Sequence, residues 1–236
     1  MPAVFVNTAT VLVGSLIGIF FRSRLRERMQ RALMTALALC TLLIGIMSAV
    51  KTENILCCII CMALGTALGE VLHIDDGIEK LGDRLKARFA KNEGAHSRFT
   101  EGFVSACILF CIGSMTIVGS LRAGIEHDYS IIFAKSTLDL VSSMAMAAAM
   151  GIGVMFAAGF VLVFQGALTL LATWVGAVLS TAVITEMSAV GGIVLLGMGI
   201  NMLELGRERI RVSNMLPAIF LPILYLPIEK LLGGLF

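Results

Sequence analysis

Charged residues are scarce in this chain of 236 residues and make up only 14% of it. A soluble domain carries roughly 25% charged residues, so this chain lacks the charges needed to cover a water-facing exterior. Apolar residues supply 58% of the sequence, the mean hydropathy is +0.96 and the formal net charge is only +2. No hydrophilic stretch is long enough for a second domain. The composition therefore predicts one integral membrane domain over residues 1–236.

The sequence also lacks the motifs of common soluble chemistry. It contains no P-loop, no HExxH zinc motif and no GxSxG nucleophile motif. Its three histidines, His73, His96 and His127, fall between the apolar runs. Intramembrane proteolysis would need a Ser/His pair or two aspartates within spans, and only one aspartate lies there. We therefore expect no enzymatic activity and no cofactor, and an ATP-driven pump would need a separate subunit.

Basic residues are absent ahead of the first apolar run, which predicts a first span rather than a cleavable signal peptide. All six cysteines lie within apolar runs. Two pairs, Cys57/Cys61 and Cys107/Cys111, have the i, i+4 spacing that metal ligands use. Because no histidine lies near them, we interpret them as small apolar side chains, and we expect no disulfide framework.

Apolar runs of about 20 residues, the length that crosses a bilayer, predict an all-α fold. Between the clear runs, residues 131–180 carry only two charges, and one helix of that length would be about 75 Å long. This segment must fold back, and the glycine-rich stretch at 151–159 is the predicted place. The six clear runs are 3–21, 32–50, 55–72, 102–121, 188–205 and 213–233. Together with the two halves of 131–180, they predict eight transmembrane helices.

Lys and Arg cluster in alternate loops. Loop 21–31 holds five arginines, loop 74–100 holds six basic residues and loop 206–211 holds three. The intervening loops hold one basic residue or none. Cytoplasmic loops carry the excess of positive charge. Eight helices with an external N-terminus place every basic loop inside, whereas seven would place 206–211 outside, so we expect eight helices and two external termini.

The longest loop has its own apolar stripe, formed by Ile74, Ile78, Leu81, Leu85 and Phe89. The spacing of three and four predicts an amphipathic helix at about 74–92, lying on the inner leaflet with its basic side near lipid head groups. A regulatory or partner-docking helix would produce the same pattern.

The first and sixth helices share an ungapped spacing of similar residues. Aligning Gly18 with Gly176 also aligns Met29 with Met187, and a glycine-containing span follows each helix. Helices 1–3 would then repeat as helices 6–8 in the opposite membrane direction, an arrangement that recurs in secondary transporters. A competing offset of three helices aligns residues 10–16 with residues 115–121.

The predicted fourth helix interrupts its own apolar run with the stretch FCIGSMTIVGSLRAG, residues 110–124. Glycine weakens a helix by about 1 kcal/mol relative to alanine, and Ser or Thr offers backbone groups alternative partners. A break at Gly113, Ser114 and Thr116 would present carbonyl and hydroxyl groups to an ion or a small solute. The alternative is close packing of helices through small residues.

The fifth predicted helix carries a lysine and an aspartate within the membrane. Lys135 and Asp139 lie four residues apart on one helical face, which Ser136 and Ser143 extend. A charge in hydrocarbon costs about 2.5–3.5 kcal/mol on insertion scales, so these side chains should face the protein interior or a cavity. In one interpretation Asp139 is a cation ligand or proton carrier, and Lys135 modulates its pKa. In the other, the two residues form a structural ion pair. A dominant Lys135 would favour an anion instead.

Other polar residues lie in or at the ends of the predicted spans. Gln165 is deep and sits beside glycine, so we include it among the candidate solute or ion ligands. Interhelical hydrogen bonding is the alternative for it. Glu186 lies at a predicted helix end, where a solvated or snorkelling side chain is the default expectation. The alternative is that it interacts with the free N–H groups at the start of helix 7. The remaining residues of this kind are Asn7, Thr8, Glu70, Asn201, Glu204 and Asn214.

Five short stretches, in this order, resemble the bacterial YdfK/YqgA-like integral membrane family over essentially the whole chain. They are GSMTIVGS, AKSTLDL, QGALTLLA, TEMSAVGG and NMLPA. That family is grouped as a domain of unknown function and is often described as candidate transporters. The resemblance implies a multi-pass protein of the bacterial inner membrane, and it brings no established substrate or site residue.

Three functions remain open from the sequence. A secondary transporter or channel-like carrier of a small solute or ion is favoured, a non-transporting membrane scaffold or complex subunit is the main alternative, and a lipid-modifying enzyme is the third. We expect membrane lipids and a small solute or ion as partners. Topology accounts for the basic loops, so no nucleic-acid partner is expected. Symmetric association is common, which favours a homodimer.

Overall fold

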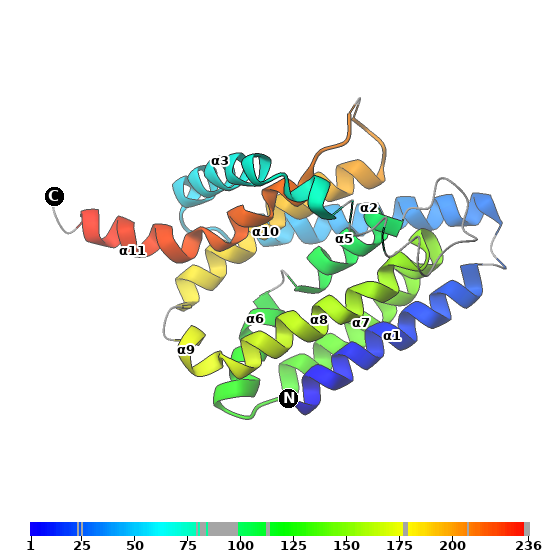
Figure 1. The fold of residues 1–236 in the computed structure, drawn as a ribbon, viewed down its shortest axis with the longest axis horizontal. Coiled ribbons are helices and arrows are strands. Elements are labelled where there is room, and N and C mark those ends of the chain that lie inside the picture. Colours follow the sequence, from blue (N-terminus) through cyan, green and yellow to red (C-terminus); the bar gives the residue numbers. More distant parts are fainter. Residues whose placement is uncertain are drawn as a thin grey trace.

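The computed structural model describes residues 1–233 except 23, 25, 79, 81–83, 85–98, 112, 113, 177, 178 and 207. Every regular element within the described residues is a helix, which confirms the all-α class (Figure 1). The helices are α1 (Pro2–Arg22), α2 (Glu27–Ala49), α3 (Ile55–Leu72), α5 (Phe99–Cys111), α6 (Ser114–Ile125), α7 (Ser130–Met150), α8 (Gly153–Leu170), α9 (Ala172–Gly176), α10 (Thr181–Met202), the 3-10 helix η1 (Val212–Phe220) and α11 (Pro222–Gly233).

The chain is a multi-pass membrane protein. In the described part, six helices are long and apolar enough to cross a bilayer: α1, α2, α3, α7, α8 and α10. Two bent pairs meet the same criteria, α5 with α6 and η1 with α11, and counting each pair as one span gives eight. The predicted fold-back of 131–180 is present, since α7 ends at Gly151. That residue has φ of +90°, a conformation that favours glycine.

The spans form two groups. The first bundle consists of α1, α5, α6, α7 and α8, with α1 packed along α7 and α5 along α8. The second bundle consists of α2, α3, α10, η1 and α11, with α2 packed on α10 and α3 on η1. Figure 1 shows α1, α7 and α8 of the first bundle on one side of α2, α3, α10 and α11 of the second.

Small residues set the closest approaches in the first bundle. In α1, a side chain at Gly14 would overlap the backbone of Leu140, and one at Gly18 would overlap the backbone of Met144. The order of these contacts makes α1 and α7 parallel. Close approach of backbones through small residues is the usual way that helices associate in a membrane, where lipid is as apolar as the side chains.

In the second bundle, glycines also bring backbones close together, here between antiparallel helices. Gly45 of α2 and Gly192 of α10 lie backbone to backbone, and Gly199 lies against Leu42. In α3, Gly65 and Gly69 lie against the backbone of Ala218 and Asn214 in η1. These directions agree with eight spans that alternate in direction.

Two predicted boundaries need correction. Helix 7 was expected over 188–205 but begins at Thr181, because Ser180 caps it by accepting a hydrogen bond from the Val183 N–H and Glu186 is buried rather than solvated. The bend between η1 and α11, 41°, was not predicted. Two prolines account for it, since Pro217 and Pro222, on either side of the junction, cannot donate backbone hydrogen bonds.

The structure does not confirm two further expectations. The inverted repeat of helices 1–3 and 6–8 is not confirmed: α2 does contact α10, and α3 contacts η1, but contact does not establish a symmetry relation. The predicted amphipathic helix at about 74–92 falls mostly outside the described residues; those of it that are described, 74–78, Lys80 and Arg84, are helical. Its start is held by Asn214, whose Oδ1 accepts a hydrogen bond from the Asp75 N–H at 2.7 Å.

The arrangement predicts which loops share a side of the membrane. In a background without the native cysteines, Arg24→Cys and Glu208→Cys should be labelled by an impermeant maleimide from one side only. Lys51→Cys and Glu126→Cys should be labelled only from the other side. All four positions are exposed. Labelling of 24 and 208 from opposite sides would contradict the eight-span arrangement.

Candidate functional site

The membrane interior of the first bundle contains a buried ion pair. Lys135 and Asp139 lie one turn apart on α7, and the Lys135 ammonium contacts Asp139 Oδ2. Their exposed fractions are only 5% and 6%. Asp139 is nine residues inside the start of α7, about 14 Å along the helix. The expectation that this face of the helix points into the protein is therefore met.

Two amide side chains join the pair from neighbouring helices. Asn7 of α1 donates through Nδ2 to Asp139 Oδ2 at 3.1 Å and to Gln165 Oε1 of α8 at 3.0 Å. Both Asn7 and Gln165 are fully buried. We call these four residues, Asn7, Lys135, Asp139 and Gln165, the polar centre. Three helices thus contribute to one connected group within the membrane.

The polar centre is not fully satisfied by itself. Among the described residues, Asn7 Oδ1 and Gln165 Nε2 have no hydrogen-bond partner. The carboxylate of Asp139 requires a donor from Asn7, which fixes the direction in which the Asn7 amide points. A buried polar atom without a partner costs about 1–3 kcal/mol. The centre therefore retains the capacity to bind one further polar group.

Ser136 and Ser143 lie on the same face of α7 but bond within their own helix. Ser136 Oγ donates to the Ile132 carbonyl at 2.8 Å, and Ser143 Oγ donates to the Leu140 carbonyl at 3.0 Å. A side chain at Gly14 of α1 would overlap Ser143 Oγ. Ser143 thus lies at the contact between α1 and α7, and both serines use their hydroxyls within α7.

The predicted break in helix 4 lies beside the polar centre. The axes of α5 and α6 differ by 56°. Gly113 lies outside the described residues, as does the side chain of Ser114, so those two candidate ligands have no described geometry. Thr116 is described and buried, and its hydroxyl donates to the Phe110 carbonyl at 2.8 Å. The last carbonyls of a helix lack helical partners, so Thr116 supplies one across the break.

The end of α5 faces the lysine of the polar centre. The Phe110 ring centroid lies 5.8 Å from Lys135 Nζ, within the range of a cation–π contact. The carboxyl end of a helix also carries partial negative charge, which favours a nearby ammonium. The broken fourth helix and the charged fifth helix, predicted separately, are therefore adjacent.

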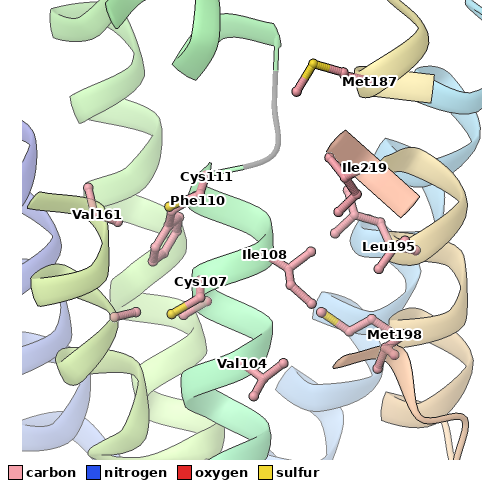
Figure 2. Packing of buried hydrophobic residues seen from close by; sticks show 14 of the residues in the cluster. Val104, Cys107, Ile108, Phe110, Cys111, Val161, Met187, Leu195, Met198 and Ile219 are labelled. Atoms are coloured by element: carbon pink, nitrogen blue, oxygen red, sulfur yellow. The ribbon is translucent and has the colours of Figure 1, made fainter. Parts of the chain in front are cut away.

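An apolar cavity of about 210 Å³ lies between the two bundles. Figure 2 shows side chains of α5 on one side of this space and those of α10 and η1 on the other. Phe103, Cys107 and Cys111 of α5 line it, together with Phe220 of η1. A second cavity shares Ile117, Phe164, Met187 and Phe220 with the first and continues toward Leu171 and Trp174. The α5–α6 pair thus stands between the cavity and the polar centre.

A second buried polar cluster lies in the second bundle. Glu186 Oε1 accepts the N–H of Glu53 at 2.8 Å and the N–H of Asn54 at 3.1 Å, while Oε2 accepts from the Thr52 hydroxyl at 2.6 Å. Glu186 therefore holds the start of α3, and the expectation that it serves the start of helix 7 is wrong. A carboxylate at a helix N-terminus is stabilised by the free N–H groups there.

Two cysteines of α3 lie close to this cluster. Cys57 Sγ and Cys61 Sγ lie 3.8 Å apart, on one face of α3. In the described part of the chain, no group of three or more His, Cys, Asp and Glu side chains is placed to hold a metal ion.

Asn7 is the residue of the polar centre that sequence reasoning did not select. It was one of several polar residues in spans, and nothing local distinguished it from Asn201. Asn201 instead bonds both the N–H and the carbonyl of Ile210 and so holds the loop after α10. The adjacent Thr8 bonds its own helix at Val4. The available signal was that Asn7 carries the only side-chain amide in the first apolar run.

The hydrogen bond across the helix break can be tested by Thr116→Val. This change leaves the Phe110 carbonyl without the hydroxyl, and we expect a loss of about 1–3 kcal/mol in stability, measured as a lower melting temperature in detergent. Thr137→Val is the matched control, because Thr137 is exposed and bonds within its own helix at Phe133. Equal shifts for the two variants would show that the bond across the break contributes nothing special.

Comparison with known proteins supports the resemblance noted in the sequence. The chain matches the family model "Protein of unknown function (DUF554)" over residues 2–226. It is 29% identical to the uncharacterized membrane protein YdfK of Bacillus subtilis (strain 168) over 220 residues, which cover 92% of this chain and 91% of the relative. It is 31% identical to the uncharacterized protein YqgA of Escherichia coli (strain K12) over 219 residues, covering 92% of each. No solved structure matches. The family model spans the whole polar centre and nearly all of the chain, which therefore belongs to the DUF554 family of proteins of unknown function.

Proposed function

We propose that the protein is a secondary transporter or channel-like carrier of a small solute or ion, and that Asp139 is the key ionisable group of its site. Asp139 and Lys135 support this because charged side chains within a membrane are costly and usually mark pathways or proton relays. Here the pair is buried among groups from three helices, with two amide atoms left without partners among the described residues.

The surroundings of the pair support the same function. Irregular backbone in a bilayer is tolerated where protein or a water-filled cavity satisfies it, and broken helices often form the sites of transporters. The bent α5–α6 pair lies against Lys135 through Phe110. On its other face is the apolar space between the bundles. A change in the angle between α5 and α6 would move the barrier between that space and the polar centre.

The proposal includes an orientation and a set of partners. Helical spans and bacterial relatives favour the bacterial cytoplasmic membrane, with the arginine-rich loops inside and both termini outside. The partners are membrane lipids and the small solute or ion, with no nucleic acid and no enzymatic step. We include a homodimer as the assembly, because symmetric association is common among membrane proteins.

The test uses proteoliposomes that contain only this protein and the internal pH dye pyranine. With an imposed Na⁺ or pH gradient, we expect dissipation of the gradient above that of protein-free liposomes. Asp139→Asn keeps the shape of the side chain and removes its charge, so it should abolish this flux. If the pair is only structural, the same change leaves Lys135 buried without its partner and costs about 3–5 kcal/mol of stability.

The double variant Asp139→Asn with Lys135→Met separates the two cases. Removing both charges should restore folding in either case, because no uncompensated charge remains. Flux should stay absent if Asp139 acts in transport and should return if the pair is structural. A double variant that folds and dissipates the gradient at the wild-type rate would contradict the proposal. Such a result would mean that transport does not depend on Asp139 and that the pair only holds α1, α7 and α8 together. Wild-type protein without flux above that of protein-free liposomes would instead favour a non-transporting scaffold.

A further inference from the structure

We infer that the polar centre is a binding site for a monovalent metal cation, and that the Lys135 ammonium occupies the place of that cation in this structure. The inference uses the site of the proposed function but concerns binding, which can be measured without flux. It begins from the groups around the ammonium. Lys135 Nζ contacts the Asp139 carboxylate and lies near the face of the Phe110 ring.

Each of these surroundings attracts positive charge. A carboxylate, the negative face of an aromatic ring and the carboxyl end of helix α5 all favour a cation. Asn7 adds a buried carbonyl oxygen, Oδ1, that has no partner among the described residues. Oxygen atoms of carboxylates and amides are the ligands that hard metal cations prefer.

The position of the Asn7 amide indicates how three oxygens can meet. Asn7 Nδ2 now lies between Asp139 Oδ2 and Gln165 Oε1, at 3.1 and 3.0 Å. A half turn of this amide would bring Oδ1 to that place. Oxygens of Asn7, Asp139 and Gln165 would then face one another and repel in the absence of a cation. A cation placed among them would be bound by all three. The amide therefore has one orientation for the lysine-paired state and another for the cation-bound state.

Charge balance selects the cation over an anion. Lys135 and Asp139 sum to zero, so an anion added to the buried pair would leave a net negative charge in hydrocarbon. A monovalent cation that displaces the ammonium keeps the carboxylate paired. Ca²⁺ and Mg²⁺ are disfavoured, because a single carboxylate would leave one of their charges uncompensated.

Lys135 has a place to go when it is displaced. It lies five residues from the start of α7, about 8 Å along the helix, whereas Asp139 is one turn deeper. A lysine has a flexible four-carbon stem and can extend its ammonium toward a membrane interface. The shorter aspartate cannot follow. The exchange therefore moves one internal charge outward while an external one takes its place.

The test measures the melting temperature of the purified full-length protein in detergent at about pH 8. NaCl or KCl is raised from about 1 to about 200 mM, with choline chloride keeping the ionic strength constant. In Lys135→Met the carboxylate has lost its internal cation, so Na⁺ or K⁺ should raise the melting temperature by about 5 °C or more. Wild type should respond less, because the metal ion must displace the lysine.

Two variants serve as controls. Asp139→Asn with Lys135→Met removes the carboxylate and should abolish the response to Na⁺ and K⁺. Lys51→Met removes an exposed lysine from the loop before α3 and should behave as wild type. If Lys135→Met does not yield folded protein, Lys135→Gln replaces it, since its neutral amide can still donate to Asp139.

Three results would overturn the inference. The first is a melting temperature of the lysine variant that responds no more to Na⁺ and K⁺ than to choline. The second is a response to lower pH alone, which would assign the carboxylate to a proton. The third is an equal response in the double variant, which would place any bound ion elsewhere. A cation response without flux in proteoliposomes would remove the transport function and leave this site standing.

Discussion

Within a bilayer, every polar group that leaves water must find its partner in the protein, and this constraint explains where the irregular parts of the structure lie. Where α5 ends, Thr116 donates to the free Phe110 carbonyl. Just before α3 begins, Glu186 from another helix accepts the N–H groups of Glu53 and Asn54. Where α7 ends, Arg22 donates to the Ala149 carbonyl at 3.3 Å. The polar centre departs from this rule, since two of its buried amide atoms have no partner among the described residues. Four isolated buried hydroxyls, those of Ser15, Ser120, Thr169 and Ser213, also lack one there.

Packing within the two bundles differs from packing between them. Within each bundle, glycines bring backbones into contact, and such contacts do not slide without overlap. Between the bundles lies an apolar space, lined largely by side chains such as Phe103, Phe164 and Phe220. Each bundle contributes one bent span to this space, α5–α6 from the first and η1–α11 from the second. The two bends and the apolar space therefore lie together, between the two bundles.

Lys135 and Asp139 connect the bonding of buried polar groups to the packing of the helices. Their pairing satisfies a charge that the membrane would otherwise make costly, and Asn7 extends it to α1 and α8. Any ligand that changes the pairing therefore acts on the contacts among three spans at once. Because Phe110 belongs to the bent α5, a movement of the Lys135 ammonium would be felt at the helix break as well.

The sequence by itself determined that the chain is all-α and crosses the membrane several times, since the length of an apolar run is a local property. It also determined that 131–180 folds back and that Lys135 and Asp139 face inward, because glycine and charge act on their own helix. For helix 4 the sequence left a break and close packing both open. The tertiary structure alone decided that Asn7 joins Gln165 and Asp139, that Ser143 serves packing against Gly14, and that Glu186 holds α3 rather than its own helix. Those contacts join residues more than a hundred positions apart, and which buried polar groups meet depends on how the bundles pack.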